Sequence, residues 1–149
     1  MTTEIKKLNK LDLGEFIQLI RVFEDVFEMK DFKIPSEKYL LNQLENKDFM
    51  VFVAISGHQV LGGLTAYILR QYYTESPQVY IYDLAVKTDY QRKGIGKNLI
   101  SGIIDYCRGE KMDEIFVQAD LEDGYAIDFY RATGGKAEEV IHFSYPLQS

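Results

Sequence analysis

The sequence predicts an α/β domain of the layered α+β type, in which helices pack on a β-sheet. Two patterns support this prediction. Some segments have apolar residues every three or four positions, which is typical of amphipathic helices, and others are short apolar runs bounded by turn residues, which is typical of strands. The length of 149 residues is within the usual range for one domain, so we expect a single domain over residues 1–149.

The N-terminal half is predicted to contain three strands and two helices. Residues 5–8 form the first short strand, and Asp12 is a candidate cap for a helix with apolar residues at positions 16, 17, 19, 20, 23 and 27. A second helix is predicted to start at Pro35-Ser36, because proline is tolerated in the first turn. Strands over residues 49–55 and 60–69 follow, joined by the turn Ser56-Gly57-His58-Gln59.

The C-terminal half is predicted to alternate strands and helices. A fourth strand over residues 78–86 precedes a helix over residues 96–106, whose apolar residues fall on one face. A fifth strand over residues 115–119 and a helix over residues 125–132 follow, and Gly134-Gly135 is a typical helix end. Residues 140–145 are predicted to form a sixth strand.

A turn with two glycines joins the fourth strand to the helix after it. Its sequence is Gln91-Arg92-Lys93-Gly94-Ile95-Gly96-Lys97. Backbone N–H groups at a helix N-terminus bind anions, and the glycines allow a phosphate to approach the backbone closely. Three basic side chains add positive charge beside the helix end. The turn is therefore predicted to bind the diphosphate of a cofactor, and the alternative is an ordinary surface helix. It matches neither Gly-x-x-x-x-Gly-Lys-Ser/Thr nor Gly-x-Gly-x-x-Gly.

The pattern Gln91-x-x-Gly94-x-Gly96, preceded by Asp83-Leu84-Ala85-Val86, resembles the acyl-CoA signature of the GCN5-related N-acetyltransferases (GNAT). The resemblance implies a mixed central sheet that splays between its fourth and fifth strands, with helices on both faces. It also implies acetyl-CoA as the cofactor. The residues that it assigns to cofactor binding are Leu84, Ala85, Val86, Gln91, Arg92, Lys93, Gly94, Ile95, Gly96 and Lys97.

A second block resembles one subgroup, the type I aminoglycoside 3-N-acetyltransferases. It comprises Tyr80 to Val86, Val117 to Asp120, Asp123, Ala126, Phe129-Tyr130, Gly134, Glu138 to Val140 and His142-Phe143, and the match covers about residues 49–145. The resemblance implies an enzyme that acetylates a polycationic small molecule, most specifically an aminoglycoside at its 3-amino group. Because dimers are frequent in this family, it also implies a homodimer with the last strand as a candidate contact.

Two residues are candidates for the chemistry of acetyl transfer. Tyr130 is in a segment that resembles the family's Phe-Tyr-x-x-x-Gly, which implies that its hydroxyl donates a proton to the cofactor sulfur. A phenol with a pKa of about 10 keeps that proton at neutral pH. Asp83 interrupts an apolar run, and a central strand rarely carries a charge without a partner or a ligand. It is a candidate to bind the acceptor's ammonium group and to help deprotonate it, directly or through water. The structural alternatives are a core aromatic residue for Tyr130 and a carboxylate paired with a neighbouring loop for Asp83.

Other polar residues are candidates for binding a cationic acceptor. Residues 120–139 contain six acidic residues against Arg131 and Lys136, so this region is predicted to attract a cation. Aspartates before a helix are also ordinary caps, and charged helix faces are usually solvated, so each candidate has a structural alternative. The candidates are Asp83, Asp120, Asp123, Glu139 and His142, with Glu24, Asp25 and Glu28 as further candidates for the wall of the same cleft.

The composition argues against several other classes of protein. A net charge of −6 is unfavourable for binding nucleic acid or an anionic membrane, and no apolar run is long enough to span a bilayer. The single cysteine, Cys107, excludes an internal disulfide and is predicted to be a core residue, and two histidines make no recognisable metal site. With no signal-peptide pattern at the N-terminus, we expect a cytoplasmic protein that transfers acetyl directly, without an acetyl-enzyme.

Two other functions remain open from the sequence. One is an acetyltransferase with the same chemistry for another amine: a polyamine, an amino sugar or a protein amine. The other is a non-catalytic module that binds acyl-CoA or a partner. The presence of both Tyr130 and Asp83 argues against the second.

Overall fold

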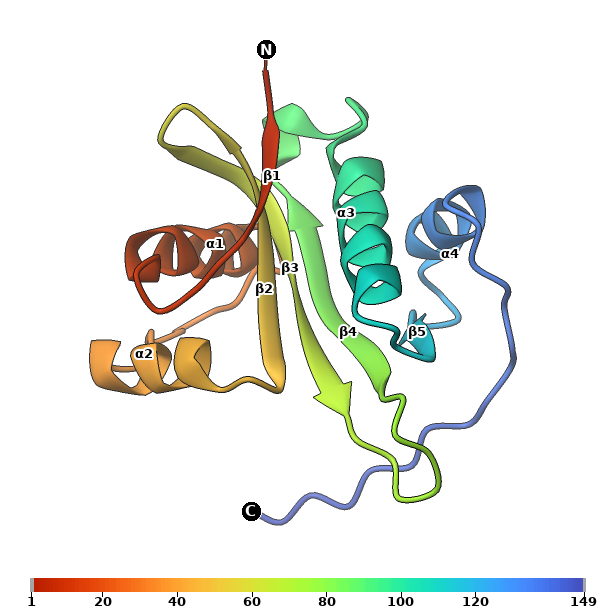
Figure 1. Ribbon diagram of the computed structural model, residues 1–149. Coiled ribbons are helices and arrows are strands. Elements are labelled where there is room, and N and C mark those ends of the chain that lie inside the picture. The colour runs from red at the N-terminus through yellow and green to blue at the C-terminus, as the bar shows by residue number, and fades with distance from the viewer. Residues whose placement is uncertain (1, 149) are drawn as a thin grey trace. The chain divides into compact units, whose positions relative to one another are not determined.

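In the computed structural model, which describes residues 2–148, the chain forms two compact units, Met1–Gln118 and Ala119–Ser149 (Figure 1). The first unit contains a sheet, three α-helices and one short 3₁₀-helix, η1 (Thr88–Tyr90). The second contains one helix, α4 (Gly124–Ala132).

The sheet of the first unit has its strands in sequence order. They are β1 (Glu4–Lys7), β2 (Phe49–Ser56), β3 (Gln59–Leu69), β4 (Gln78–Val86) and β5 (Glu114–Val117). Neighbouring strands are antiparallel except for β4 and β5, which are parallel. The β4–β5 ladder joins only Gln78–Ile81 to Glu114–Val117, so the second half of β4 pairs with β3 alone. This confirms a mixed sheet that opens between its fourth and fifth strands.

The helices of the first unit cover both faces of the sheet (Figure 1). Helices α1 (Leu13–Val26) and α2 (Glu37–Glu45) lie on one face, and α3 (Ile95–Gly109) lies on the other. The α3 face is packed through buried apolar residues at the predicted spacing, and the buried position of Cys107 confirms it as a core residue. No helix within residues 2–148 has the length and hydropathy needed to cross a membrane.

The two N-terminal helices begin in different ways. Ser36 is the N-cap of α2, and its hydroxyl accepts a hydrogen bond from the backbone N–H of Tyr39 at 3.2 Å. Asp12 occupies the N-cap position of α1, but its carboxylate makes no capping bond to the helix. It accepts instead from the backbone N–H of Asn9 at 2.8 Å and from Nζ of Lys6 at 2.9 Å. Asp12 therefore pairs with Lys6 on β1 and does not form the predicted cap of α1.

The second unit differs from the prediction after its helix. Helix α4 has the predicted position, and it ends before Gly134, whose φ of +100° is typical of a glycine after a helix. The predicted sixth strand over residues 140–145 is wrong, because these residues have no regular structure and are exposed. A strand needs a partner for its backbone groups, and no described strand pairs with this segment.

Candidate active site

The turn between β4 and α3 has the geometry of an anion site. Gly94 is the N-cap of α3, with φ +83° and ψ 3°, a left-handed conformation that glycine adopts without strain. The first bond of the helix runs from the N–H of Asn98 to the carbonyl of Gly94 at 3.0 Å. The N–H groups of Ile95, Gly96 and Lys97 therefore have no acceptor within the helix, and no side chain in the described part of the chain caps this end.

Positive side chains surround this helix end. Arg92, Lys93 and Lys97 are all exposed, and Nζ of Lys93 lies 5.5 Å from the centre of the Tyr90 ring. Arg92 has a φ of +61°, so two of the three residues from 92 to 94 are in the left-handed region. Successive N–H groups in such turns form concave anion sites, and the charges add to the partial charge of the helix.

Two of the predicted cofactor residues have a structural role. The side-chain amide of Gln91 donates a hydrogen bond to the backbone carbonyl of Val86 at 3.0 Å, which holds the turn against the end of β4. The side chain of Ile95 is buried in the core, so only its backbone faces the turn. The motif thus positions the turn as well as exposing its N–H groups.

The second half of β4 provides backbone groups next to this turn. Leu84, Ala85 and Val86 pair with β3 on one side only, because the ladder to β5 has already ended at Ile81. The side chains of Ala85 and Val86 are buried, so these residues present the backbone at the opening of the sheet. The opening, the helix end and the basic residues together fit an elongated, phosphorylated cofactor.

Asp83 is placed by a β-bulge in β4. Thr65 pairs with Asp83, but the next residue of β3, Ala66, pairs with Ile81, so Tyr82 is the extra residue. Asp83 therefore shares the α1 face of the sheet with Thr65. Its carboxyl is half-buried, and burial raises its pKa. Within residues 2–148 no hydrogen bond or ion pair reaches this carboxylate, so no loop partner for it is present among these residues.

Aromatic rings next to Asp83 were not predicted as site residues. Tyr67 on β3 pairs with Tyr80 on β4, which pairs with Phe116 on β5, and the bulge adds Tyr82 to the same face. We call Tyr67, Tyr80, Tyr82 and Phe116 the aromatic cluster. The sequence signal was the abundance of tyrosine, 11 of 149 residues, but only the strand register brings these rings together.

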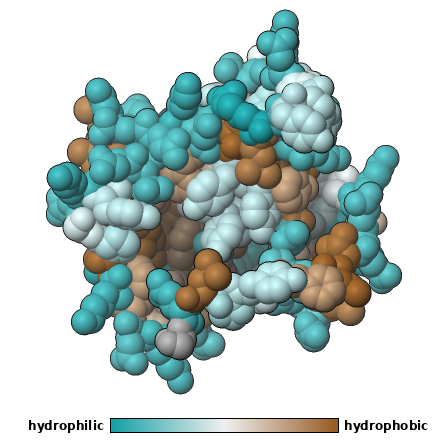
Figure 2. Space-filling model, turned by 90° about the horizontal axis from the view of Figure 1, so that it is seen from below, coloured by the Kyte–Doolittle hydropathy of each residue, from teal (hydrophilic) through white to brown (hydrophobic). Residues whose placement is uncertain are grey.

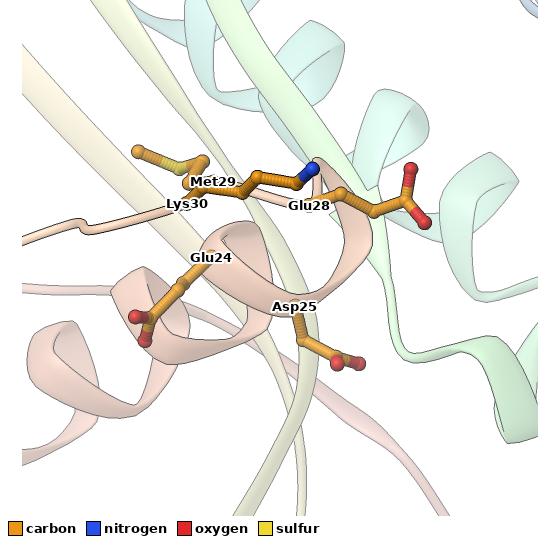
Figure 3. Close-up of a pocket in the computed structure, with 5 residues that line it drawn as sticks. All are labelled: Glu24, Asp25, Glu28, Met29 and Lys30. Atoms are coloured by element: carbon orange, nitrogen blue, oxygen red, sulfur yellow. The ribbon is translucent and has the colours of Figure 1, made fainter.

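An acidic hollow of about 400 Å³ lies at the end of α1. It is lined by Glu24, Asp25, Glu28, Met29 and Lys30. Figure 3 shows that the three carboxylates point in different directions from the end of the helix. Glu24 also forms an ion pair with Arg21, with a distance of 2.8 Å from Nη1 to Oε1. Such separated charges suit an extended cation better than a single metal ion.

The second unit contains the other candidates. Tyr130 is a half-buried residue of α4 whose ring contacts that of Phe129, with 5.1 Å between the ring centres. The carboxylate of Asp123 caps this helix by accepting from the N–H of Ala126 at 3.0 Å, and the carbonyl of Asp120 accepts from the N–H of Asp123 at 2.9 Å. Asp123 is therefore a helix cap, which was the structural alternative to its predicted role in binding the acceptor.

Glu139 and His142 are exposed, and they lie outside any strand. The structure does not support the strand on which they were expected to line the acceptor site. Among residues 2–148, no group of three or more His, Cys, Asp or Glu side chains is arranged to hold a metal ion.

Comparisons with known proteins agree with this geometry. Residues 16–134 match the acetyltransferase (GNAT) family. Crystal structures of an aminoglycoside acetyltransferase from an uncultured soil metagenomic sample, in complex with sisomicin and with trehalose, have a TM-score of 0.96 and 50% identity, over 98% of this chain and 97% of theirs. A second such enzyme from an uncultured soil sample has a TM-score of 0.93 and 31% identity, over 99% of this chain and 100% of its own.

A curated relative, N-alpha-acetyltransferase 30 of Saccharomyces cerevisiae, is 36% identical over 55 residues. This match spans 37% of the chain and about a third (31%) of the yeast protein. The family match covers most of the chain, including the turn and the helix end described above. This chain belongs to the acetyltransferase (GNAT) family.

Proposed function

We propose that this protein transfers an acetyl group from acetyl-CoA to an amine of an aminoglycoside, most specifically the 3-amino group. The observation that supports the acceptor class most is the 50% identity, over nearly the whole chain, to an aminoglycoside acetyltransferase crystallised with sisomicin. The 3-amino position rests on the resemblance of residues 80–86 and 117–143 to the type I 3-N-acetyltransferases.

Acetyl-CoA is the proposed cofactor because the β4–α3 region suits its parts. The N–H groups of Ile95, Gly96 and Lys97 and the charges of Arg92 and Lys93 would hold its phosphates. The backbone of residues 84–86, on the side that faces away from β3, would bind its amide-containing arm. When bound, acetyl-CoA supplies the activated acetyl group.

Asp83 is the proposed acceptor-binding carboxylate. An ammonium group is a poor nucleophile until it loses a proton, and a half-buried carboxylate without a partner can both attract the cation and take that proton. Burial has raised the pKa of Asp83, which makes it a stronger base than an exposed aspartate. Further carboxylates at the end of α1 would bind the other ammonium groups of a polycation.

Tyr130 is the proposed general acid, which holds a proton at its Oη. Tyr130→Phe keeps the ring and removes that proton, so we expect kcat to fall about 100-fold or more while the affinity for CoA stays the same. Isothermal titration calorimetry with CoA provides the control for the fold of the variant. Unchanged turnover would refute the role of Tyr130.

The test of the function is thiol release from acetyl-CoA with a panel of amines. The panel contains gentamicin and sisomicin, then spermidine, glucosamine and a lysine peptide. We expect turnover with the aminoglycosides, and NMR of the product would then identify the acetylated nitrogen. Turnover with only another amine would refute the acceptor class and leave the family and its chemistry unchanged. CoA binding without any turnover would favour a non-catalytic module.

A further inference from the structure

The aromatic cluster forms a continuous row across three strands. The rings of Tyr80 and Phe116 are stacked, with 4.8 Å between their centres and 7° between their planes. Tyr82 meets Tyr80 at 5.9 Å and Tyr67 at 5.7 Å, both edge to face. Contacts with two neighbours restrict the Tyr82 ring, so little conformational entropy remains to be lost when a ligand binds.

This row is exposed although it lies on the face that α1 and α2 cover elsewhere. Tyr82 is 58% exposed and Tyr67 is 36% exposed, whereas Val51 and Val53, on the same face, are buried beneath the helices. Figure 2 views the sheet from the end where β3 stops and β4 starts, and pale side chains of intermediate hydropathy occupy the middle of the view. The helices therefore leave part of the sheet free for a ligand.

A carboxylate lies at the edge of this row. Asp83 is next to Tyr82 in the chain and opposite Thr65, and its charge contributes to the raised pKa of Tyr67, after burial and the neighbouring Tyr82 and Tyr39. The face thus combines flat aromatic surface with one negative charge that has no partner among the described residues. This combination matches a sugar ring that carries an ammonium group, because the ring's C–H face packs on an aromatic surface and the cation is attracted by both the π-face and the carboxylate.

We propose that the aromatic cluster is a stacking surface for an amino-sugar ring of the acceptor, with Tyr82 as the main contact and Asp83 as the partner of its ammonium group. This inference rests on the proposed function and deepens it. Carboxylates alone would bind any polycation, and the rings make the site selective for cyclic amines over linear ones.

The kinetic test compares Tyr82→Ala with Tyr82→Phe, which keeps the ring. We expect Tyr82→Ala to raise the KM for gentamicin about 3- to 10-fold, with kcat and the KM for acetyl-CoA within about twofold of wild type. Tyr82→Phe should keep the KM within about twofold. The control is Tyr72→Ala, which removes a tyrosine that is 99% exposed and whose ring contacts that of Tyr73, outside the aromatic cluster, and it should change neither constant.

Two results would overturn the inference. One is an unchanged KM for gentamicin in Tyr82→Ala. The other is an equal rise in Tyr82→Phe, which would assign the effect to the hydroxyl group. Circular dichroism and the melting temperature show whether each variant is folded. If Tyr82→Ala is not folded, the binding experiment on the wild-type protein tests the inference.

A binding experiment separates this inference from the proposed function. In saturation-transfer NMR with aromatic protons irradiated, the ring protons of gentamicin and glucosamine should receive magnetisation, and the methylene protons of the linear amine spermidine should not. The signal should fall at least about threefold in Tyr82→Ala. If the enzyme binds gentamicin in this way but does not acetylate it, the proposed function is refuted and the proposal of a stacking surface is supported. If wild type transfers no magnetisation to either sugar, the stacking surface is wrong.

Discussion

Substitution of Gly94 tests the proposed phosphate turn, because the backbone strain that a side chain causes in the protein can be separated from its steric obstruction of the phosphate. With φ +83°, any other residue at this position is strained. Apart from its own chain neighbours and helix backbone, a Cβ added to Gly94 would meet no atom of residues 2–148 within 4 Å, so there is room for a side chain. That side chain would project beside the free N–H groups of α3, where a phosphate is proposed to bind.

Gly57 is the matched control. It has a φ of +62° in the turn between β2 and β3, and a Cβ there would also meet nothing within 4 Å. A left-handed residue with a side chain costs about 1–2 kcal/mol, so Gly94→Ala and Gly57→Ala should lose similar stability. For a chain of this length that is a fall in melting temperature of roughly 2–8 °C. Only Gly94 lies in the proposed cofactor site.

The assay is isothermal titration calorimetry with CoA on Gly94→Ala, Gly94→Val and Gly57→Ala. A hydrogen bond to a charged group contributes about 1.5–3 kcal/mol, so the loss of one N–H contact to a phosphate should weaken binding about 10- to 100-fold. We expect this loss in the Gly94 variants, with valine worse than alanine, and no loss in Gly57→Ala. Wild-type affinity in Gly94→Val would refute the site, and an equal loss in Gly57→Ala would show that stability alone causes the effect.

Three further predictions concern buried or close-packed residues. Asp83→Asn should lower turnover about 100-fold or more, and its stability in urea at neutral pH should equal or exceed wild type. The raised pKa of Asp83 means that its negative charge destabilises the folded state. This cost is absent once acid protonates the carboxyl, so the stabilities of the variant and the wild type should converge at low pH. A variant that is less stable than wild type at neutral pH would contradict this. Gly62→Ala should lower the free energy of unfolding by about 1–3 kcal/mol, because its Cβ would lie 2.7 Å from the carbonyl oxygen of Ala85. Gly14→Ala, with open space around it in α1, should raise the free energy of unfolding by about 0.5–1 kcal/mol. Equal urea midpoints for the two variants would refute this packing. Burial raises the pKa of Cys107 to about 11, so a disulfide reagent should label this thiol only after denaturation, and rapid labelling of the folded protein would be inconsistent with its position.

The phosphate turn could be predicted from sequence because all its determinants are local. The strand Gln78–Val86 has the predicted bounds, and helix α3 starts one residue from the predicted position. The positive φ of Gly94 follows from glycine's freedom at a turn before a helix. The structural role of Gln91 could not be predicted, because its bond to Val86 depends on how the intervening residues fold back.

The C-terminal segment shows the limit of local patterns. Residues 141–145 alternate β-branched and aromatic side chains with polar ones, which favours a strand. Strand formation also needs a partner edge, and a sequence pattern does not specify one. In the structure this segment is exposed and unpaired within the described part of the chain, and its side chains Val140, Ile141, Phe143 and Tyr145 are all largely accessible.

Asp83 shows why the acceptor side of the site needed the structure. Strict alternation along β4 would place Asp83 on the same face as Val79 and Ile81, which are buried beneath α3. An unpaired carboxylate there would be fully desolvated, at a cost of several kcal/mol. The bulge at Tyr82 shifts the alternation by one residue, so that Asp83 lies on the α1 face beside the exposed tyrosines. The same extra residue therefore keeps the charge accessible and adds a ring to the aromatic cluster. Removing it by deleting Tyr82 would exchange the faces of every residue on one side of the bulge, which is why the site depends on this irregularity rather than on any single contact.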